Sequence, residues 1–319
     1  MIDLVPAANI LEAQARISPY IHRTPVLTSR SLNELAGCEL FFKCENMQRG
    51  GAFKARGAFN ASLSLTPDEL KNGIATHSSG NHATALSLAG KTLGTAAYVV
   101  MPSNSKKIKV ASVKAFGGRI TFCEPNLKAR EDTLAKVIEA TGASFIPPYD
   151  DPRIIAGQAT AANELIEDIP ELDTIIAPVG GGGLLSGTAL SSFYFGNNIM
   201  VFAAEPEGAN DAWRSMQEGH IVPSINPDTI ADGLLTSLGN NNFPIIRQFV
   251  KKIITVDDNE IISALRLIWE RLKIVVEPSS ATVLAAVLKS PDDFKGTKTG
   301  LILSGGNVDL AETATWFNT

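Results

Sequence analysis

The feature that most constrains the fold is a repeated strand-then-helix rhythm that begins at residue 73. The pattern predicts strands over 73–77, 96–102 and 119–123, each followed by a helix, over 83–93, 105–116 and 127–141. Such alternation with short connections is typical of parallel strands covered by helices. We therefore expect an α/β fold.

The rhythm continues in the second half of the chain. Apolar strand-like runs recur over 174–179, 200–204 and 300–303. A chain of 319 residues exceeds the size at which one hydrophobic core usually splits in two, so two lobes are expected. No repeat, low-complexity tract or Ser/Pro-rich linker separates them. We therefore expect continuous structure to cross between the lobes, with a cleft where they meet.

Composition narrows the function classes. Hydrophobic residues make up 45% of the chain, charged residues 19%, and the formal net charge is -5, so no basic excess would recruit nucleic acid or an anionic membrane. Residues 1–6 lack the pattern of a secretory signal, and no stretch approaches membrane-spanning length. We expect a cytoplasmic protein. Its three cysteines, Cys38, Cys44 and Cys123, are expected to be reduced and structural.

A single lysine, Lys54, stands beside a glycine pair and Phe53 at the start of a small-residue helix within the stretch 48–60. Light packing there would allow the amine to lose its water. Burial disfavours the ammonium form and leaves the free amine that an imine-forming lysine needs. A surface lysine at a helix start is the alternative, and for an arbitrary lysine it is the commoner case.

Four consecutive glycines, 180–183, follow a predicted strand and open a helix. Unhindered backbone N–H groups at a helix N-terminus can converge on an anion such as a phosphate. The run is neither a P-loop nor a strict G-x-G-x-x-G motif. A plain glycine-rich turn is the alternative. Four glycines cost conformational entropy that a turn alone would not require, which favours the anion site.

Polar groups also follow two further strands. The run 78–82 offers backbone donors, hydroxyls and an amide at a helix start, which suits a substrate carboxylate. The alternative is a helix N-cap made by a serine or by Asn81. The run 304–307, at the end of the last strand, brings a hydroxyl to the same kind of crevice, although by itself it is only a turn.

Together these pieces occur in the order and spacing of fold-type II pyridoxal-phosphate enzymes, the tryptophan synthase β-like group. More closely, the chain resembles the serine racemase and serine/threonine dehydratase family. The likeness covers nearly every residue. It includes further motifs at 24–27, 155–158, 230–233 and 276–278.

The resemblance implies an α/β fold of two lobes, each with a mostly parallel sheet covered by helices. Residues 1–67 and 149–319 would form a large cofactor-binding domain, and residues 68–148 a small, mobile substrate domain. A homodimer is also implied. The chain stops at residue 319 without an added regulatory region, as the short, single-module members do.

The resemblance also assigns a cofactor site. Lys54 would form the Schiff base with pyridoxal phosphate, Phe53 would pack against the ring face, and Asn81 would bond the ring hydroxyl. Ser304 would face the pyridine nitrogen, where a hydroxyl leaves the ring a weaker electron sink than a carboxylate would. The phosphate would be held by the backbone N–H groups of Gly180, Gly181, Gly182, Gly183 and Leu184.

Substrate residues follow from the same resemblance. Lys54 would remove the α-proton, and Ser79, on the opposite face of the cofactor ring, would return one during racemisation. Arg130 and Thr236 lie where family members contact the far end of the substrate, and a solvated helix charge is the equal alternative for Arg130. The α-carboxylate would bind at Ser78, Ser79, Asn81 and His82.

The family pattern further supplies a divalent-cation site at 204–211. The Glu205 and Asp211 carboxylates and the Ala209 carbonyl would give the all-oxygen shell that Mg²⁺, Ca²⁺ or Mn²⁺ prefers. From spacing alone, an acidic loop capping the next helix is an equal alternative.

The chain departs from racemase-like relatives at several positions. Ala52 stands where those relatives commonly have serine. Polar side chains with which nucleotide-responsive racemases contact ATP are also missing, which makes ATP activation doubtful. The residues at those positions are Arg49, Gly50, Thr84 and Phe116.

The expected activity is elimination of water from L-serine, or from the related L-threonine or 3-hydroxyaspartate, to give a keto acid and ammonia. Racemisation of serine would compete with elimination. The alternative is a dehydratase of threonine or L-threo-3-hydroxyaspartate with negligible racemase activity. A non-catalytic ligand-binding protein is the rival from another class, and retention of Lys54, Ser79, the glycines and Ser304 argues against it.

Overall fold

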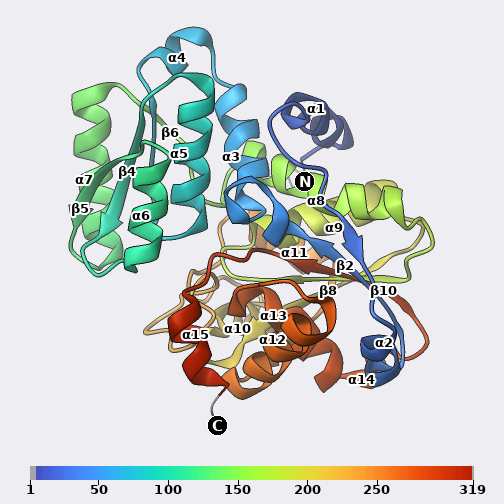
Figure 1. Cartoon of the computed structure of the whole chain (residues 1–319). Helices are drawn as coiled ribbons and strands as arrows, with labels where there is room; N and C mark the ends of the chain where they lie inside the picture. Colours follow the sequence, from blue (N-terminus) through green and yellow to red (C-terminus); the bar gives the residue numbers. More distant parts are fainter. Residues whose placement is uncertain (1–4, 318–319) are drawn as a thin grey trace.

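The computed structural model describes residues 5–317 and folds them into two lobes (Figure 1). Residues 1–4, which begin the N-terminal stretch without a signal pattern, lie outside the described residues. One lobe is built on a 6-stranded sheet and the other on a 4-stranded sheet. Nearly all strand pairs are parallel, which confirms the predicted α/β architecture.

The large sheet has the order β1-β2-β10-β7-β8-β9, and only β1 runs antiparallel to its neighbour. Its strands lie far apart in the sequence, because β1 and β2 precede the small lobe and β7 to β10 follow it. Their bounds are β1 Val26–Leu27, β2 Glu39–Cys44, β7 Thr174–Pro178, β8 Met200–Pro206, β9 Val250–Val256 and β10 Lys298–Leu303.

Helices cover both faces of this sheet because successive strand side chains point to opposite sides. In β7, Ile175 and Ala177 pack into one hydrophobic core and Ile176 packs into the other. One face is covered by α1 Ala7–Ile17, α8 Pro152–Asp168, α9 Gly183–Phe195 and α11 Asn242–Phe249. The other is covered by α2 Arg30–Ala36, α12 Asp258–Leu272, α13 Pro278–Lys289 and α14 Pro291–Phe294.

The small sheet has the order β5-β4-β3-β6, and its strands come from residues 74–145. The strands are β3 Ile74–His77, β4 Ala97–Pro102, β5 Arg119–Cys123 and β6 Ser144–Phe145. The helices of this lobe are α4 Pro67–Lys71, α5 Asn81–Leu93, α6 Lys107–Ala115 and α7 Leu127–Thr141. The boundaries and mobility predicted for the substrate domain stay predictions.

One helix, α3 Lys54–Leu63, contacts both α8 of the large lobe and α5 of the small lobe. It therefore stands where the lobes meet (Figure 1). The remaining helices, α10 Asp211–Glu218 and α15 Leu310–Trp316, belong to the large lobe. Across residues 5–317, the helices are too short or too polar to cross a membrane.

Candidate active site

Lys54 is the first residue of α3, and its amine is enclosed where the lobes meet. Its Nζ donates a hydrogen bond to the Pro148 carbonyl at 2.6 Å and lies 5.0 Å from the centre of the Phe53 ring. No carboxylate pairs with this amine in the described residues. Some of the side chain remains exposed, but burial of the amine lowers the Lys54 pKa to about 8. A neutral amine, as imine chemistry requires, is therefore within reach at physiological pH.

The end of β10 is joined directly to the lysine segment. Phe53 N–H donates to the Ser304 carbonyl at 3.0 Å, and Ala52 pairs with Gly305 in an antiparallel bridge. The Ser304 side chain is 3% exposed, and its Oγ lies 3.1 Å from the Ser280 hydroxyl. A side chain on Gly51 would collide with Asn307 at 2.4 Å, so this close approach requires glycine. Ser304 and Lys54 thus belong to one site, although they are distant in the sequence.

The run 78–82 crosses to the same site from the small lobe. Helix α5 begins at Asn81 after Gly80, with no side-chain cap, so the N-cap alternative is not what the structure shows. Asn81 Nδ2 donates to Glu277 Oε1 at 2.7 Å, while its Oδ1 accepts from Asn307 at 3.0 Å. Ser79 is half-buried, and its hydroxyl makes no hydrogen bond to another described residue. Ser78 accepts from the Gly80 N–H at 3.3 Å.

The charge of Lys54 acts on His82, the last residue of the run 78–82. Its Nε2 lies 3.1 Å from the Ile146 carbonyl, and the ring is buried. Burial, and then the nearby Lys54 charge, lower the His82 pKa to about 3. The imidazole is therefore neutral at physiological pH, and it contributes shape and hydrogen bonding rather than charge.

The glycine loop supplies a cluster of free donors. Gly182 has φ +93° and precedes the 13-residue helix α9. Among the described residues, the backbone N–H groups of 180–183 have no acceptor. A Cβ on Gly181 would meet the Tyr149 ring at 2.4 Å, so the loop must be glycine to pack there. Free N–H groups at the positive end of a helix fit a phosphate.

Glu277, which the sequence marked only as part of a motif, is buried and accepts the hydrogen bond of Asn81. Burial, with the Asp232 charge adding to it, raises the pKa of Glu277 to about 7, although Lys109 and the Asn81 amide act against this. Among the described residues, no donor lies at hydrogen-bond distance from its buried Oε2. The local pattern of a glutamate before Pro278 predicts only a helix cap, and the Glu277 side chain makes no cap hydrogen bond.

Arg130, the predicted contact for the far end of the substrate, is an arginine of the small lobe. Arg130 is half-buried in α7, and its Nε has no hydrogen-bond partner. After burial, the Arg130 charge is the next cause of the lowered His77 pKa, and it also counteracts the raised Tyr149 pKa. The charge of Arg130 therefore acts on both rings, and its half-buried side chain is not a fully solvated helix charge. Thr236 is exposed, in a loop whose Leu234 contacts Gly180.

The predicted metal ligands lie where β8 passes through a turn, residues 207–209, into α10. Both Glu205 oxygens accept backbone N–H groups of α10 at 2.7 Å, so the helix-capping alternative is realised. Neither Asp211 oxygen has a partner at hydrogen-bond distance, although the Ser224 hydroxyl lies near enough to lower its pKa. Ala209 is buried in the turn.

The raised pKa values of the two carboxyl groups are consistent with a cation between them. Burial, joined by mutual repulsion, raises the Glu205 pKa to about 8, and burial raises the Asp211 pKa to about 6. Within residues 5–317, no group of three His, Cys, Asp or Glu side chains could hold a metal ion. A cation would have to rely on these two carboxylates, a carbonyl and water.

Comparison with known proteins places the chain among enzymes of similar length. The family model described as "Pyridoxal-phosphate dependent enzyme" matches residues 17–305. The chain is 50% identical to a beta-hydroxyaspartate dehydratase of Paracoccus denitrificans, over 95% of this chain and 96% of that protein. It is also 50% identical to a serine racemase of Dictyostelium discoideum, over 96% of each chain.

A solved structure extends this likeness to three dimensions. The crystal structure of serine racemase from Dictyostelium discoideum superposes with a TM-score of 0.92 at 49% identity. The match covers 97% of this chain and 100% of that one.

Proposed function

The chain belongs to the pyridoxal-phosphate dependent enzyme family, and we propose that it is an ammonia-lyase (dehydratase) of small β-hydroxy amino acids that also racemises serine. One observation carries this proposal most directly. The Lys54 amine is buried without a carboxylate partner among the described residues, and it donates to Pro148, whose neighbour Tyr149 packs against the glycine loop that carries the free N–H groups. An unpaired amine beside an anion cradle fits a phosphorylated aldehyde.

The residues present fit pyridoxal phosphate. Residues 180–184 would hold its phosphate, Lys54 its aldehyde carbon, and the Ser304 hydroxyl its ring nitrogen. When bound, the cofactor supplies an aldehyde for the substrate amine and a ring that delocalises the electron pair left at the α-carbon. Asn81 already donates to Glu277 and accepts from Asn307, so it would contact the ring hydroxyl through its remaining N–H.

Lys54 performs proton abstraction in this proposal. The substrate α-carboxylate binds at the N-terminus of α5, where Ser78, Asn81 and His82 lie, and this orients the α-proton toward the Lys54 amine. The amine takes that proton, the β-hydroxyl leaves as water after gaining a proton, and hydrolysis of the dehydrated product releases a keto acid and ammonia. A Lys54 pKa near 8 suits a base that must take a proton and return it at neutral pH.

Racemisation needs a second proton carrier on the opposite side of the α-carbon. Ser79 fits that role because its hydroxyl is half-buried and free of other hydrogen bonds. Serine loses its α-proton to one residue and receives a proton from the other, which inverts the centre. Racemisation and elimination then compete for the same carbanion.

The second candidate function is dehydration of 3-hydroxyaspartate, and a specific observation favours it. Arg130 has an unpartnered, buried Nε, and its charge reaches His77 and Tyr149. A guanidinium without a carboxylate partner would bind the second carboxylate of a dicarboxylic substrate. Thr236 would line the same end of the pocket.

Other features of the proposal rest on the family. We propose a homodimer acting in the cytoplasm, with residues 68–148 moving to close the site over substrate. A divalent cation would be held by Glu205, Ala209 and Asp211, because two repelling, buried carboxylates gain most from a positive ion.

The test is a set of parallel incubations of the cofactor-loaded enzyme with L-serine, D-serine, L-threonine and L-threo-3-hydroxyaspartate. Keto-acid release and the chirality of the remaining amino acid are measured in each. Keto-acid release from at least one hydroxy amino acid is the expected result. No turnover of any of the four, in protein whose absorbance shows attached cofactor, would reject the proposal.

A further inference from the structure

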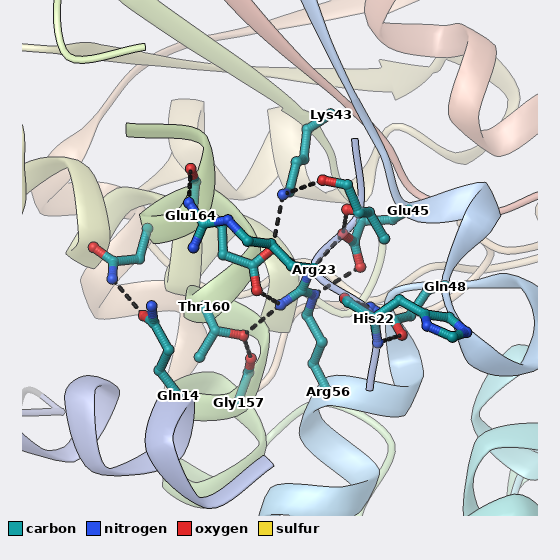
Figure 2. Close-up of polar contacts among 12 residues, drawn as sticks. Gln14, His22, Arg23, Lys43, Glu45, Gln48, Arg56, Gly157, Thr160 and Glu164 are labelled. Atoms are coloured by element: carbon teal, nitrogen blue, oxygen red, sulfur yellow. Dashed lines mark hydrogen bonds and ion pairs between the residues drawn. The ribbon is translucent and has the colours of Figure 1, made fainter. Parts of the chain in front are cut away.

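A buried ion cluster is centred on Arg56, two residues after Lys54 in the first turn of α3. Its members are the side chains of Arg56, Glu45, Glu164 and Lys43, all essentially removed from solvent (Figure 2). None of them is needed to bind or convert substrate in the proposed function. Buried ion pairs are weak contributors to stability, since well-packed apolar side chains often do as well. Their best-attested use is to fix one arrangement of the elements that they join.

Arg56 is at the centre of the cluster and uses all of its N–H donors. Nε and Nη2 donate to the two oxygens of Glu45 at 2.7 and 2.8 Å. Nη1 and Nη2 donate to the two oxygens of Glu164 at 2.8 Å each, and Nη1 also donates to Thr160 Oγ1 at 3.0 Å. Figure 2 shows the planar group held between residues of two other elements. Glu45 follows β2, whereas Thr160 and Glu164 belong to α8.

The first turn of α3 has other anchors, but none of them is an ion pair: the Gly57 N–H donates to Gln158 Oε1 at 3.3 Å, and the Lys54 amine donates to the Pro148 carbonyl. Helix α3 begins at Lys54 without a side-chain cap, and the residues around Arg56 are Ala55, Gly57 and Ala58. Small side chains allow close contact: a Cβ on Gly157 of α8 would meet Gly57 Cα at 2.7 Å. The bidentate fork of Arg56 adds directional, charged hydrogen bonds to these contacts, and its two carboxylates come from different elements, the segment after β2 and α8.

The charges of the cluster are not a resolved cause of the Lys54 pKa shift. Two carboxylates compensate the guanidinium, and burial is the sole resolved cause of the lowered Lys54 pKa. Arg56 can therefore act on Lys54 through geometry rather than through charge.

We propose that Arg56 is a positioning residue for Lys54, fixing the first turn of α3 so that the amine is aimed at the aldehyde carbon of the cofactor. This inference rests on the proposed role of Lys54. Misplacement of a reacting group by about 1 Å can cost roughly a hundredfold in rate. The rate of covalent attachment of the aldehyde to Lys54 therefore reports on the fork directly, without any substrate.

The main variant is Arg56→Lys, which keeps a positive charge but loses the planar fork. The matched control is Lys43→Met. Lys43 belongs to the same cluster, donating to Glu164 at 2.7 Å and to the Thr24 carbonyl at 2.8 Å, but it lies on β2, and its hydrogen bonds and ion pairs to described residues do not include α3. Both variants disturb a buried ion cluster, and only one of them releases the lysine-bearing helix.

The full-length chain is stripped of cofactor, and the attachment rate of pyridoxal 5'-phosphate is followed by absorbance well below each variant's Tm. Binding of the aldehyde-free analogue 4'-deoxypyridoxine phosphate is measured in parallel to report the phosphate site alone. We expect Arg56→Lys to slow attachment at least about tenfold with analogue affinity within about threefold of the parent. Lys43→Met should lower Tm but leave the attachment rate within about threefold of the parent.

Equal slowing by the two variants would make the cluster merely structural, and an unchanged rate in Arg56→Lys would overturn the proposal. If Arg56→Lys does not fold, Thr160→Val removes one acceptor of the fork and leaves both carboxylates in place. Attachment slowed by about threefold is then expected, and a parental rate would reject the inference. Absence of attachment in the parent protein would instead overturn the proposed role of Lys54, which keeps the two failures distinct.

Discussion

The ion cluster around Arg56 and the cleft around Lys54 are both buried and polar, yet their groups are satisfied to opposite degrees. In the cluster, every donor of Arg56 has an acceptor, and its carboxylate partner Glu164 has a lowered pKa because two cations outweigh its burial. In the cleft, Lys54 has only a carbonyl, and Glu277 has an oxygen with no partner. Their pKa values shift toward neutrality instead.

The difference separates structure from chemistry. Paired charges stay charged and hold elements in place, whereas buried groups without partners are ready to exchange protons or to receive a ligand. Lys54 and Arg56, which carry the two regions, are only two residues apart in the first turn of α3. The chain thus keeps a rigid anchor next to a reactive amine.

The largest effect is expected from removing the reactive amine. Lys54→Ala should lower elimination and racemisation at least about a thousandfold, because no base remains at the α-carbon. The fold should persist, since the paired cluster is untouched, and circular dichroism checks this. The exposed Lys114→Ala is the control and should keep parental kcat/KM. Near-parental keto-acid release from Lys54→Ala would end the assignment.

The next effect concerns the opposite side of the α-carbon. Ser79→Ala should abolish conversion of L- to D-serine and reduce elimination from D-serine by about a hundredfold or more. Elimination from L-serine should largely survive, because Lys54 remains. The measurement is kcat/KM for keto-acid release from each enantiomer, with racemisation followed separately. Equal losses for both enantiomers would make Ser79 a binding residue and remove the racemase half of the proposal.

A smaller effect is expected at the unpaired guanidinium of the cleft. Arg130→Gln should reduce kcat/KM for L-threo-3-hydroxyaspartate by about tenfold to a hundredfold, because a charged hydrogen bond to the second carboxylate is lost. Serine turnover should change much less. Arg119→Gln, an exposed arginine of the same lobe, is the matched control. A parallel loss for serine and hydroxyaspartate would assign Arg130 to general structure.

Stability should respond to pH through Lys54. Its folded pKa of about 8 lies below the ordinary 10.5, so the folded state disfavours the proton that the unfolded chain keeps below pH 10.5. Lys54→Met should therefore stabilise the cofactor-free protein at pH 7 by about 1–2 kcal/mol, after allowance for partial exposure. The gain should shrink above pH 8 and vanish above about pH 10.5. A pH-independent Tm difference between Lys54→Met and the parent would contradict the buried-amine account.

The smallest effect is expected from removing a divalent cation. Chelation should lower Tm by about 2–4 °C, and Mg²⁺ or Mn²⁺ should restore it, because loss of roughly 1 kcal/mol shifts Tm by that amount. Glu205→Gln should abolish the response to chelation, whereas Glu207→Gln, on an exposed neighbour, should preserve it. Indifference of the parent protein to both chelator and metal would reject the site.

Much of the fold follows from local pattern. The helix predicted over 127–141 and the strand predicted over 119–123 are found with those bounds. A helical period marks the first, and a short strand-like run marks the second. Strand β9 was missed. It lies at the sheet edge, where Lys251 and Lys252 are exposed and interrupt the apolar run. Edge strands tolerate such charges, so their sequence signal is weak.

The candidate site was predictable only in part, because several of its residues have hydrogen-bond partners that are far away in the sequence. Glycine and small-residue patterns marked Lys54 and 180–183, since the close approach of backbone chains can be seen locally. Glu277 and Arg56 lie in motifs that the sequence singled out, but neither was assigned a role. Arg56 meets Glu164 across 108 positions of sequence, and Asn81 meets Glu277 across 196.

The sequence by itself determined the chemical groups and the strand ends that carry them, because hydrophobic period and glycine placement act over a few residues. Only the tertiary structure decided which of those groups are paired. Lys43 and Lys54 are both lysines of one segment, yet one is held by Glu164 and the other is left with a carbonyl. Ionisation depends on burial and on partners brought from elsewhere in the chain. The fold therefore made one lysine structural and the other reactive.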